Sequence, residues 1–427
     1  MVLFHPRRIL RRILKLDAFE KMHQLFLERR VAREHSSMVR RLRKKAGKDR
    51  IRVVFYTNEP QKWSYESLYR AFEQSPYFKP VFVVVPRYMA HIGKDHTRMT
   101  LEEQYAFYKD RGYHVEYGYE NGRYLDIKTF EPDVFFYLQL AEVPGIDNPE
   151  IVSKYALTCY CPYSFSLTDY RKEYLPQFHR LLFRYYVVHE WTKERFEGYA
   201  EGNSRNCVVV GYPKLDVYFK DLPADADKYW EEPSKVKVIY APHHSVKDSF
   251  LFSTFPATHQ VILALARSTR DRTTWVFKPH PMLKRALMHA GLMTEAELED
   301  YYRAWGEIGR VYDQGDYFDI FKSSDLMITD CASFLAEYLP SGKPLIRLIN
   351  PASCPFDRLG SRFSDCYYNV HDEEELKQVF DELVIRGNDS MAAHRKEVAD
   401  TLIDPRQTAA EKILGDLQVT LGIGRAA

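Results

Sequence analysis

The sequence has no long apolar run and no recognisable secretory leader. No uninterrupted apolar stretch in the 427 residues approaches the ~20 residues that a membrane-spanning helix needs. The first residues are basic, but no apolar segment with a small-residue cleavage site follows them. These absences predict a cytoplasmic protein that does not cross a membrane.

Cysteine is scarce, and its spacing matches neither a redox motif nor a zinc motif. Cys159 and Cys161 form a C-x-C pair, which is neither the redox C-x-x-C nor half of a usual zinc knuckle. The other cysteines are scattered, so we expect buried free thiols in a reducing compartment. The sequence also lacks H-x-x-x-H, and nothing in it predicts a required metal or other cofactor.

Apolar and aromatic residues are abundant, and charge is distributed unevenly. Hydrophobic residues make up 45% of the chain, with 31 Tyr and 26 Phe, which predicts a globular protein of two domains at this length. Residues 1–50 hold 16 Lys and Arg against 5 Asp and Glu, whereas the remainder holds 45 against 54. A basic arm on an acidic body is typical of a targeting device.

The basic arm has the pattern of an amphipathic helix. Apolar residues alternate with basic ones at helical spacing, and the apolar set includes Ile9, Leu10, Ile13, Leu14 and Leu16. We interpret residues 1–50 as a segment that binds an anionic membrane surface, peripheral on the inner face of the cell membrane. A helix packed on the protein body and a basic arm for nucleic acid are the alternatives, although no nucleic-acid motif supports the latter.

The rest of the chain reads as two α/β halves. Residues 51–222 contain apolar strand-like runs separated by helical segments, and a proline-bearing polar linker follows near residues 222–236. Residues 223–427 repeat the alternation. In this half, strands are expected at 236–240, 274–277, 311–312, 325–328 and 345–348, and helices at 256–270, 282–305, 316–323, 373–385 and 391–415. The predicted fold class is therefore α/β, with two Rossmann-like domains.

Residues 325–348 read as strand, tight turn, helix, turn and strand. Asp330 is expected to cap the helix, with Ser333 in its first turn. Such a unit directs free backbone N–H groups toward the carboxyl edge of a parallel sheet, where anions bind. Lys343 adds a positive charge there if its side chain reaches this edge. The plainer interpretation is that Asp330 and Ser333 only cap a helix.

Three loops of the second half should meet at one edge, because each follows a predicted strand. They are residues 240–245 with His243 and His244, residues 277–281 with Lys278 and His280, and residues 329–333 with Glu337 one turn further. Imidazoles, a lysine and hydroxyls with few free carboxylates suit the binding of a phosphate or diphosphate. Adjacent histidines at a strand end point in opposite directions, which disfavours a metal site. Taken singly, each histidine is more often structural than functional.

These segments resemble a known family. Tyr-Ala-Pro at 240–242, Lys-Pro-His-Pro at 278–281, Ile-Thr-Asp-x-x-Ser at 328–333 and Gly-Lys-Pro at 342–344 resemble the CDP-glycerol:poly(glycerophosphate) glycerophosphotransferases. Members of that family make teichoic-acid and capsule polymers in bacteria. The resemblance implies a GT-B fold, in which the two domains face a cleft and the C-terminal one binds the nucleotide. It also implies a donor site, whose expected residues are Lys278, His280, Thr329, Asp330, Ser333, Glu337 and Lys343.

The sequence departs from the family pattern at one place. The polymerases carry a Trp-His-Gly-Thr segment whose histidine is the expected base, whereas residues 159–164 here read Cys-Tyr-Cys-Pro-Tyr-Ser. We therefore expect His243 or His244 to act as the base together with a catalytic His280. Glu59 and Asp169 are less favoured substitutes. On the acceptor side we expect Glu59, Trp63 and Tyr163.

The predicted function is transfer of glycerol phosphate, or a related polyol phosphate, from a CDP-linked donor to a cell-surface glycan or polyprenyl-lipid-linked acceptor, with release of CMP. A GT-B glycosyltransferase that uses a CMP-activated sugar acid, of the sialyl or Kdo type, is the first alternative. A non-catalytic relative that binds nucleotide or glycan is the second.

Overall fold

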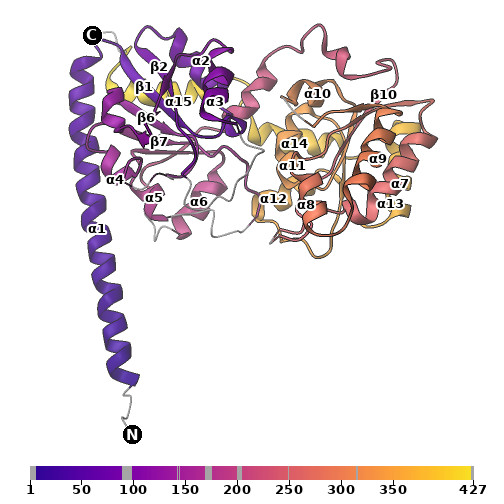
Figure 1. Cartoon of the computed structure of the whole chain (residues 1–427), viewed down its shortest axis with the longest axis horizontal. Helices are drawn as coiled ribbons and strands as arrows, with labels where there is room; N and C mark the ends of the chain where they lie inside the picture. Colours follow the sequence, from indigo (N-terminus) through magenta and orange to yellow (C-terminus); the bar gives the residue numbers. More distant parts are fainter. Residues whose placement is uncertain are drawn as a thin grey trace. The chain divides into compact units, whose positions relative to one another are not determined.

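The computed structural model describes residues 6–88, 99–141, 143, 145–168, 176–199, 204–248, 250–313 and 316–424, and the chain divides into two α/β units (Figure 1). The first unit comprises Met1–Tyr163, Arg171–Lys214 and Gln407–Ala427, and the second comprises Ser164–Tyr170 and Leu215–Arg406. The first unit gives way to the second between Lys214 and Leu215, whereas the boundary expected from the sequence is at residue 222. The last helix, however, belongs to the first unit, and Asp169 lies outside the described residues.

A seven-stranded parallel sheet forms the centre of the first unit. Its strand order is β3-β2-β1-β6-β7-β8-β9, with apolar strands buried on both faces, as parallel sheets require. The strands are β1 Ile51–Thr57, β2 Phe78–Val84, β3 Val115–Tyr117, β6 Val134–Tyr137, β7 Leu157–Tyr160, β8 Arg184–Val187 and β9 Cys207–Val209. A two-stranded hairpin, β4 Tyr119–Glu120 with β5 Arg123–Tyr124, follows β3.

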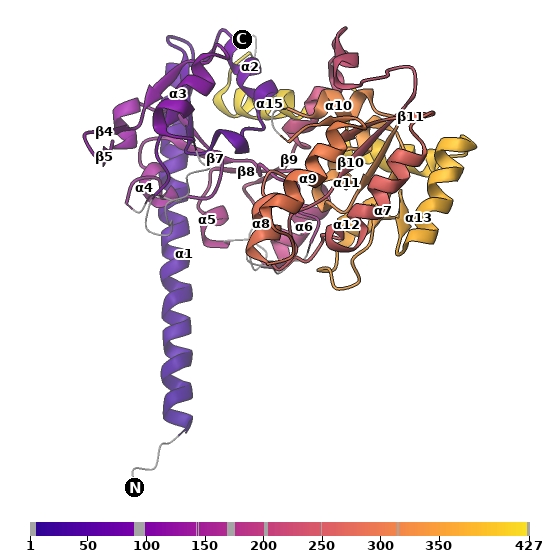
Figure 2. The same ribbon diagram turned by 45° about the vertical axis from the view of Figure 1, so that its right-hand side comes forward.

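Helices cover both faces of this sheet (Figures 1 and 2). They are α1 Pro6–Lys45, α2 Glu66–Gln74, α3 Leu101–Lys109, α4 Pro149–Val152, α5 Pro176–Arg180, α6 Glu190–Tyr199 and α15 Ala409–Leu421, with short 3₁₀ turns η1 Pro60–Lys62 and η3 Ile127–Phe130. From α1, Met38 and Leu42 are buried in the same core cluster as Ile413 and Leu417 of α15. These apolar contacts explain why the end of the chain joins the first unit.

The second unit is built on a six-stranded parallel sheet with the order β12-β11-β10-β13-β14-β15. Its strands are β10 Val236–Ala241, β11 Thr273–Phe277, β12 Arg310–Val311, β13 Leu326–Thr329, β14 Leu345–Leu348 and β15 Tyr368–Val370. The predicted strands of this half agree with the observed ones to within about one residue. The exception is β15, a short strand whose Tyr-Asn-Val sequence gave no apolar run.

Helices also lie on both faces of the second sheet (Figure 1). They are α7 Phe255–Ser268, α8 Leu283–His289, α9 Glu295–Gly306, α10 Phe318–Ser323, α11 Ala332–Glu337, α12 Arg358–Ser364, α13 Glu373–Phe380 and α14 Ala392–Leu402. Shorter turns are η5 Pro213–Phe219, η6 Ala226–Tyr229 and η7 Leu339–Ser341, and a π-helical turn η8 spans Asp381–Ile385. On one face, α7, α8, α9 and α13 contribute to a single apolar core cluster with the strands.

Two long helices of the sequence prediction are each divided in the structure. The expected helix 282–305 is α8 and α9, separated at Gly291, whose φ of +67° is left-handed, and at Thr294, which begins α9 with a capping box. The expected helix 391–415 is α14 and α15, separated by Pro405 and by a second capping box at Thr408. Both stop signals were present in the sequence, and local capping explains both divisions.

The N-terminal helix is anchored to the first unit along its later half. Leu27 and Val31 are buried with Leu181, and the Nε2 of buried His35 lies 3.1 Å from the Thr158 hydroxyl. This half matches the alternative of a packed helix. Within the described part of the chain, no helix combines the length and apolar character needed to cross a bilayer.

Candidate functional site

The three predicted loops of the second unit leave one edge of its sheet. From β10 the chain moves to β11 and β12 on one side, then returns to β13 on the other side. Such a reversal of strand order is the point at which α/β sheets usually bind ligands, beyond the carboxyl ends of the strands. The loops after β10 and β13 flank this point, and the loop after β11 is their neighbour.

Asp330 joins the loop after β13 to the loop after β10. Its Oδ1 accepts a hydrogen bond from the backbone N–H of His243 at 2.5 Å. Its Oδ2 accepts two more from Thr254, from the backbone N–H at 2.6 Å and from the hydroxyl at 2.9 Å. Burial raises the pKa of Asp330 to about 6, although these hydrogen bonds oppose the shift. Both oxygens are occupied by the protein, so Asp330 holds the histidine loop in place.

The prediction that Asp330 caps the following helix is wrong. The N-cap residue of α11 is Cys331, whose side chain makes no capping hydrogen bond. Thr329 also has a structural connection, because its hydroxyl donates to the carbonyl of Ala241 at 2.5 Å and accepts from the N–H of Cys331 at 3.0 Å. Residues 329 and 330 thus join neighbouring strands and loops.

Backbone hydrogen bonds fix the ring of His280. Its Nδ1 accepts a hydrogen bond from the N–H of Met282 at 3.1 Å, and its own backbone N–H donates to the carbonyl of Pro242 at 3.1 Å. An imidazole nitrogen that accepts a hydrogen bond carries no proton, so the neutral ring has its proton on Nε2. His280 therefore has a hydrogen-bond donor at Nε2 even without a positive charge.

His243 is held in the same tautomer. Its Nδ1 accepts from the backbone N–H of Ser245 at 3.2 Å and lies 2.7 Å from the Ser245 hydroxyl. That hydroxyl oxygen accepts from the N–H of Phe252 at 2.9 Å, which leaves its own proton for His243. The neutral ring of His243 therefore also carries its proton on Nε2.

His244 differs from the other two histidines. Its Nδ1 is buried and has no hydrogen-bond partner among the described residues. The ring stacks on His280 with centroids 3.9 Å apart and lies 4.4 Å from the ring of His243. One nitrogen from each of the three rings lies within 4.8 Å of the others. The structure thus brings together all three histidines that the sequence singled out.

All three histidines are neutral near pH 7. Burial lowers the pKa of His243 to about 3, with His244 adding to the shift. Burial, followed by both neighbouring histidines and Lys278, lowers the pKa of His280 to about 2. Burial also lowers the pKa of His244, which Asp248 opposes. The cluster is therefore uncharged near neutral pH and offers hydrogen-bonding groups instead of positive charge.

Lys278 and Glu337 lie buried among aromatic rings. The Nζ of Lys278 is 4.4 Å from the ring centroid of Tyr317 and 5.5 Å from that of Phe334. The carboxylate of Glu337 accepts a hydrogen bond from the Tyr317 hydroxyl, and its carbonyl accepts one from Tyr218 at 2.8 Å. Tyr317 thus links the two charged residues.

Two other predicted donor residues have separate positions. Ser333 lies in the first turn of α11, with its Oγ 3.4 Å from the Sγ of Cys331. The Nζ of Lys343 donates to the carbonyls of Lys322, at 2.9 Å, and Ser324. These carbonyls precede β13, so the structure places Lys343 at the amino edge of the sheet and does not bring it to the histidines.

Sequence reasoning missed Arg347. It pairs in register with Thr329 across β13 and β14, and its Nη1 donates to the Ser364 hydroxyl at 2.7 Å. Its guanidinium lies 4.2 Å from the ring centroid of Phe356. Burial lowers the pKa of Arg347 to about 10, with the charge of Asp330 opposing the shift. The signal was a single cation within the apolar run of β14.

The first unit has a polar cluster at its own switch point, between β1 and β6. Glu59 follows β1 and forms an ion pair with Lys62 at 2.8 Å and a longer one with Arg87 at 3.7 Å. Lys62 also donates to Gln139, which follows β6, at 2.7 Å, and Gln139 donates in turn to Asn58. Glu59 is therefore part of a network of charged and amide groups.

The other two acceptor-side predictions differ in their surroundings. Trp63 packs against Phe55 and Phe82, and its indole N–H donates to the Tyr113 hydroxyl at 3.1 Å, so it belongs to the aromatic core. Tyr163 is half-buried beside the polar cluster, with its ring centroid 5.1 Å from the Nζ of Lys62. Five of the six cysteines are buried, and all six are free thiols, as predicted.

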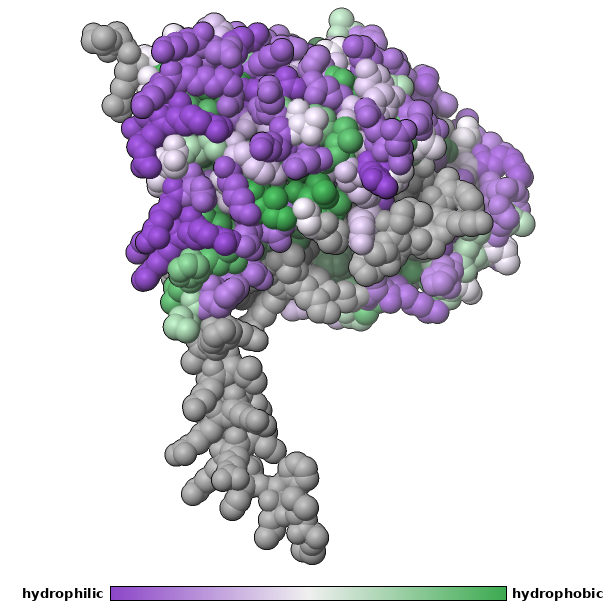
Figure 3. All heavy atoms as spheres, turned by 60° about the vertical axis from the view of Figure 1, so that its left-hand side comes forward, coloured by the Kyte–Doolittle hydropathy of each residue, from purple (hydrophilic) through white to green (hydrophobic). Residues whose placement is uncertain are grey.

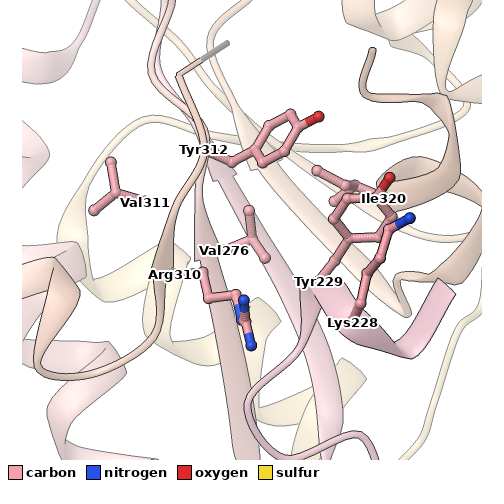
Figure 4. A pocket seen from close by; sticks show the side chains of 7 residues that line it. All are labelled: Lys228, Tyr229, Val276, Arg310, Val311, Tyr312 and Ile320. Atoms are coloured by element: carbon pink, nitrogen blue, oxygen red, sulfur yellow. The ribbon is translucent and has the colours of Figure 1, made fainter. Parts of the chain in front are cut away.

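A pocket of about 410 Å³ lies on the β11–β12 side of the second unit (Figure 4). Its aromatic walls are Tyr229 and Tyr312, whose rings are nearly perpendicular with centroids 5.7 Å apart. Lys228 and Arg310 add cations, and Figure 4 shows Val276 between Arg310 on one side and Lys228 with Tyr229 on the other. None of the lining residues is among the site residues that the sequence predicted.

Comparisons with known proteins agree with this arrangement. Residues 183–350 match the family model described as CDP-glycerol:poly(glycerophosphate) glycerophosphotransferase. The loops after β10, β11 and β13, which carry the three histidines and Asp330, all lie in that range. A search of the curated proteins found no match.

Solved structures share the fold at low sequence identity. A histidine-to-asparagine variant of the wall teichoic acid polymerase TagF is 11% identical with a TM-score of 0.56, over 93% of this chain and 97% of that one. UDP-GlcNAc 2-epimerase from Neisseria meningitidis, bound to UDP-GlcNAc, is 12% identical with a TM-score of 0.54, over 87% and 99%. MnaA from S. aureus with UDP is 13% identical with a TM-score of 0.53, over 87% and 97%.

The two Rossmann-like units therefore form a GT-B fold, as the sequence predicted. Residues 183–350 resemble the CDP-glycerol:poly(glycerophosphate) glycerophosphotransferase family, and this match together with the shared fold indicates a glycerophosphotransferase-like transferase.

Proposed function

We propose that this protein transfers glycerol phosphate, or a related polyol phosphate, from a CDP-linked donor to a cell-surface glycan or polyprenyl-lipid-linked acceptor. CMP is released, and the product is a teichoic-acid-like or capsule polymer. The observation that supports this proposal is the cluster of three neutral histidines at the switch point of the second unit, within the residues that match the family model. Hydrogen-bond donors at such an edge suit the oxygens of a diphosphate.

The chemistry proposed is an in-line displacement at the β-phosphorus of the donor. The oxygen of an acceptor hydroxyl forms a new P–O bond, and the bond from the β-phosphorus to the bridging oxygen breaks, so that CMP leaves with both bonding electrons. The hydroxyl proton passes to a base on the protein. Positioning and electrostatic stabilisation account for the rate enhancement of such reactions.

The acceptor is proposed to bind the first unit through the cluster around Glu59. Ammonium, carboxylate and amide groups together suit a ligand rich in hydroxyls, and the ring of Tyr163 offers an apolar face beside them. Trp63 is not included, because its core contacts explain its position.

The test is CMP release from CDP-glycerol, with and without a membrane extract that supplies acceptor. We expect His280→Ala to reduce release by 100-fold or more, because it removes a donor directed at the diphosphate. His289→Ala, at an exposed position at the end of α8 in the same unit, is the matched control and should retain full activity.

Other outcomes identify the alternatives. If CDP-glycerol releases no CMP but a CMP-linked sugar acid does, the protein is a glycosyltransferase. The same histidine N–H groups could hydrogen-bond the phosphate oxygens of either nucleotide. If CDP binds in calorimetry and no donor is turned over, the protein is a nucleotide-binding relative without this activity.

We further propose that the protein associates with an anionic membrane surface through α1, on the cytoplasmic side. Three large apolar side chains of this helix are well exposed, namely Met22 at 62%, Leu25 at 55% and Phe26 at 65%. Their spacing places them on one helix face. Figure 3 shows hydrophobic atoms gathered at the lower end of the described part of this face, next to hydrophilic ones.

A further inference from the structure

The three histidines are not equivalent in their hydrogen bonding, and this difference assigns separate roles to them. Backbone N–H groups occupy the Nδ1 atoms of His243 and His280. The Nδ1 of His244 is buried without a partner among the described residues. Two rings are therefore fixed in one tautomer, whereas the structure leaves the tautomer of the third open.

We propose that His243 and His280 hydrogen-bond the donor's phosphate oxygens through neutral Nε2–H groups, and that His244 accepts the proton of the attacking hydroxyl. This inference rests on the proposed function and deepens it, because it names the role of each histidine. It also replaces the missing histidine of the first unit with a base on the loop after β10.

The assignment of His243 and His280 as hydrogen-bond donors follows from the effect that a second proton, on Nδ1, would have on each ring. If His280 took a proton on Nδ1, that new N–H would face the N–H of Met282, and the hydrogen bond between them would be lost. The same conflict arises between His243 and the N–H of Ser245. Both rings therefore resist protonation and are poor bases, yet each keeps an Nε2–H donor at neutral pH.

The same geometry disfavours a metal ion. A neutral histidine that binds a metal through Nε2 must carry its proton on Nδ1 and donate it to an acceptor. Here, the groups next to Nδ1 in His243 and His280 are N–H donors. Although the three nitrogens are close enough to surround an ion, these two rings would have to break their backbone hydrogen bonds to bind it.

His244 is suited to the remaining task. It is neutral at pH 7 and adjoins both donor rings, so a hydroxyl attacking a phosphate held by those rings approaches it. In the transfer step, the acceptor oxygen bonds to the β-phosphorus, CMP leaves with the electrons of the broken P–O bond, and the hydroxyl proton moves to a nitrogen of His244. Transfer of that proton to water restores the neutral ring.

The tautomers are measured directly by long-range ¹H–¹⁵N NMR of the full chain labelled with ¹⁵N-histidine, with signals assigned through single histidine variants. We expect His243 and His280 to show Nε2–H and an unprotonated Nδ1 from pH 6 to pH 8. A proton on Nδ1 of either ring overturns the assignment of His243 and His280 as Nε2–H hydrogen-bond donors. The measurement needs no substrate, so it is independent of the transfer activity.

Glutamine variants separate donors from base, because a glutamine amide can donate from about the position of Nε2 but cannot take a proton. We expect His280→Gln and His243→Gln to keep activity within about 10-fold, whereas His280→Leu raises the KM for CDP-glycerol by more than that. His244→Gln should lower kcat by about 10²–10⁴-fold with CDP binding unchanged. Added imidazole should restore part of the activity of His244→Gly.

The opposite pattern, with His280→Gln inactive and His244→Gln active, overturns the base assignment. A one-to-one site for Zn²⁺ in calorimetry that His280→Gln abolishes overturns the tautomer argument. If the wild type shows the expected tautomers and binds CDP but releases no CMP from any donor, the proposed transfer and the role of His244 both fail. The role of His243 and His280 as hydrogen-bond donors to a bound anion then stands by itself.

Discussion

At the scale of single residues, the carboxylate of Asp330 receives hydrogen bonds from two segments that lie 87 and 76 positions away in the sequence. It fixes the backbone of His243 and the start of α7 at Thr254. Because three donors point at it, an uncharged amide of the same shape cannot replace it. One NH₂ group would face an N–H group, whichever way the amide turned.

We therefore expect Asp330→Asn to destabilise the second unit by about 2–4 kcal/mol, since at least one buried donor loses its acceptor. Urea unfolding measures this change. Asp325→Asn is the matched control, because Asp325 also accepts from a backbone N–H, that of Lys237 at 2.9 Å, but is exposed. An equal loss in the two variants would contradict the organising role of Asp330.

At the scale of elements, α1 has two parts with different surroundings. In its later part Leu27, Val31, Met38 and Leu42 are buried on the first unit, and Lys45 pairs with Asp133 at 2.5 Å. Met22, Leu25 and Phe26, which come earlier, are exposed. A helix that is fixed at one end and apolar at the other suits attachment to a surface.

Co-sedimentation with lipid vesicles tests this attachment. We expect the wild type to bind vesicles that contain anionic lipid better than neutral ones, because basic residues near such a surface contribute about 1 kcal/mol each. Serine at positions 22, 25 and 26 together should weaken binding at least 10-fold, since less apolar surface is buried. Met288→Ser, which changes an exposed methionine of α8, should have no effect. Binding that is unchanged in the triple variant would refute the proposal.

At the scale of the whole molecule, buried neutral histidines make stability depend on pH. Burial, with a smaller contribution from Arg184, lowers the pKa of His35 to about 3. Burial also lowers the pKa values of His243 and His280, to about 3 and about 2. Between pH 6.5 and these values, the unfolded chain binds protons that the folded chain does not. The free energy of unfolding therefore falls as the pH falls. Asp330, whose pKa is raised, acts in the opposite sense between about pH 4 and 6.

His35→Gln isolates one such group, because glutamine can keep a hydrogen bond to Thr158 without titrating. Below pH 6.5 the free energy of unfolding should fall less steeply in the variant than in the wild type, by up to about 1.4 kcal/mol per pH unit. Above pH 7 the difference between the two proteins should be constant. Urea midpoints measured from pH 8 to pH 4 give both slopes, and parallel slopes would contradict the buried, neutral state of His35.

Much of the fold was predictable from local sequence, for a physical reason. A parallel sheet buries both faces of its strands, so β10, β11, β13 and β14 appear as apolar runs, and loops that follow them must meet at one edge. The position of His243, His244 and His280 at one edge therefore followed from the sequence alone. Caps at Thr294 and Thr408 were also local signals, although the long helical patterns obscured them.

Other features depended on contacts between distant segments, which no local pattern encodes. The carboxylate of Asp330 crosses to Thr254 instead of capping its own helix, Lys343 lies at the amino edge, and α15 packs with α1 instead of with α14. The sequence by itself thus determined which elements form and which residues lie at the sheet edge, because periodicity and burial are local properties. Only the tertiary structure decided which nitrogen of each histidine is free, because backbone groups of the folded loops set the tautomers.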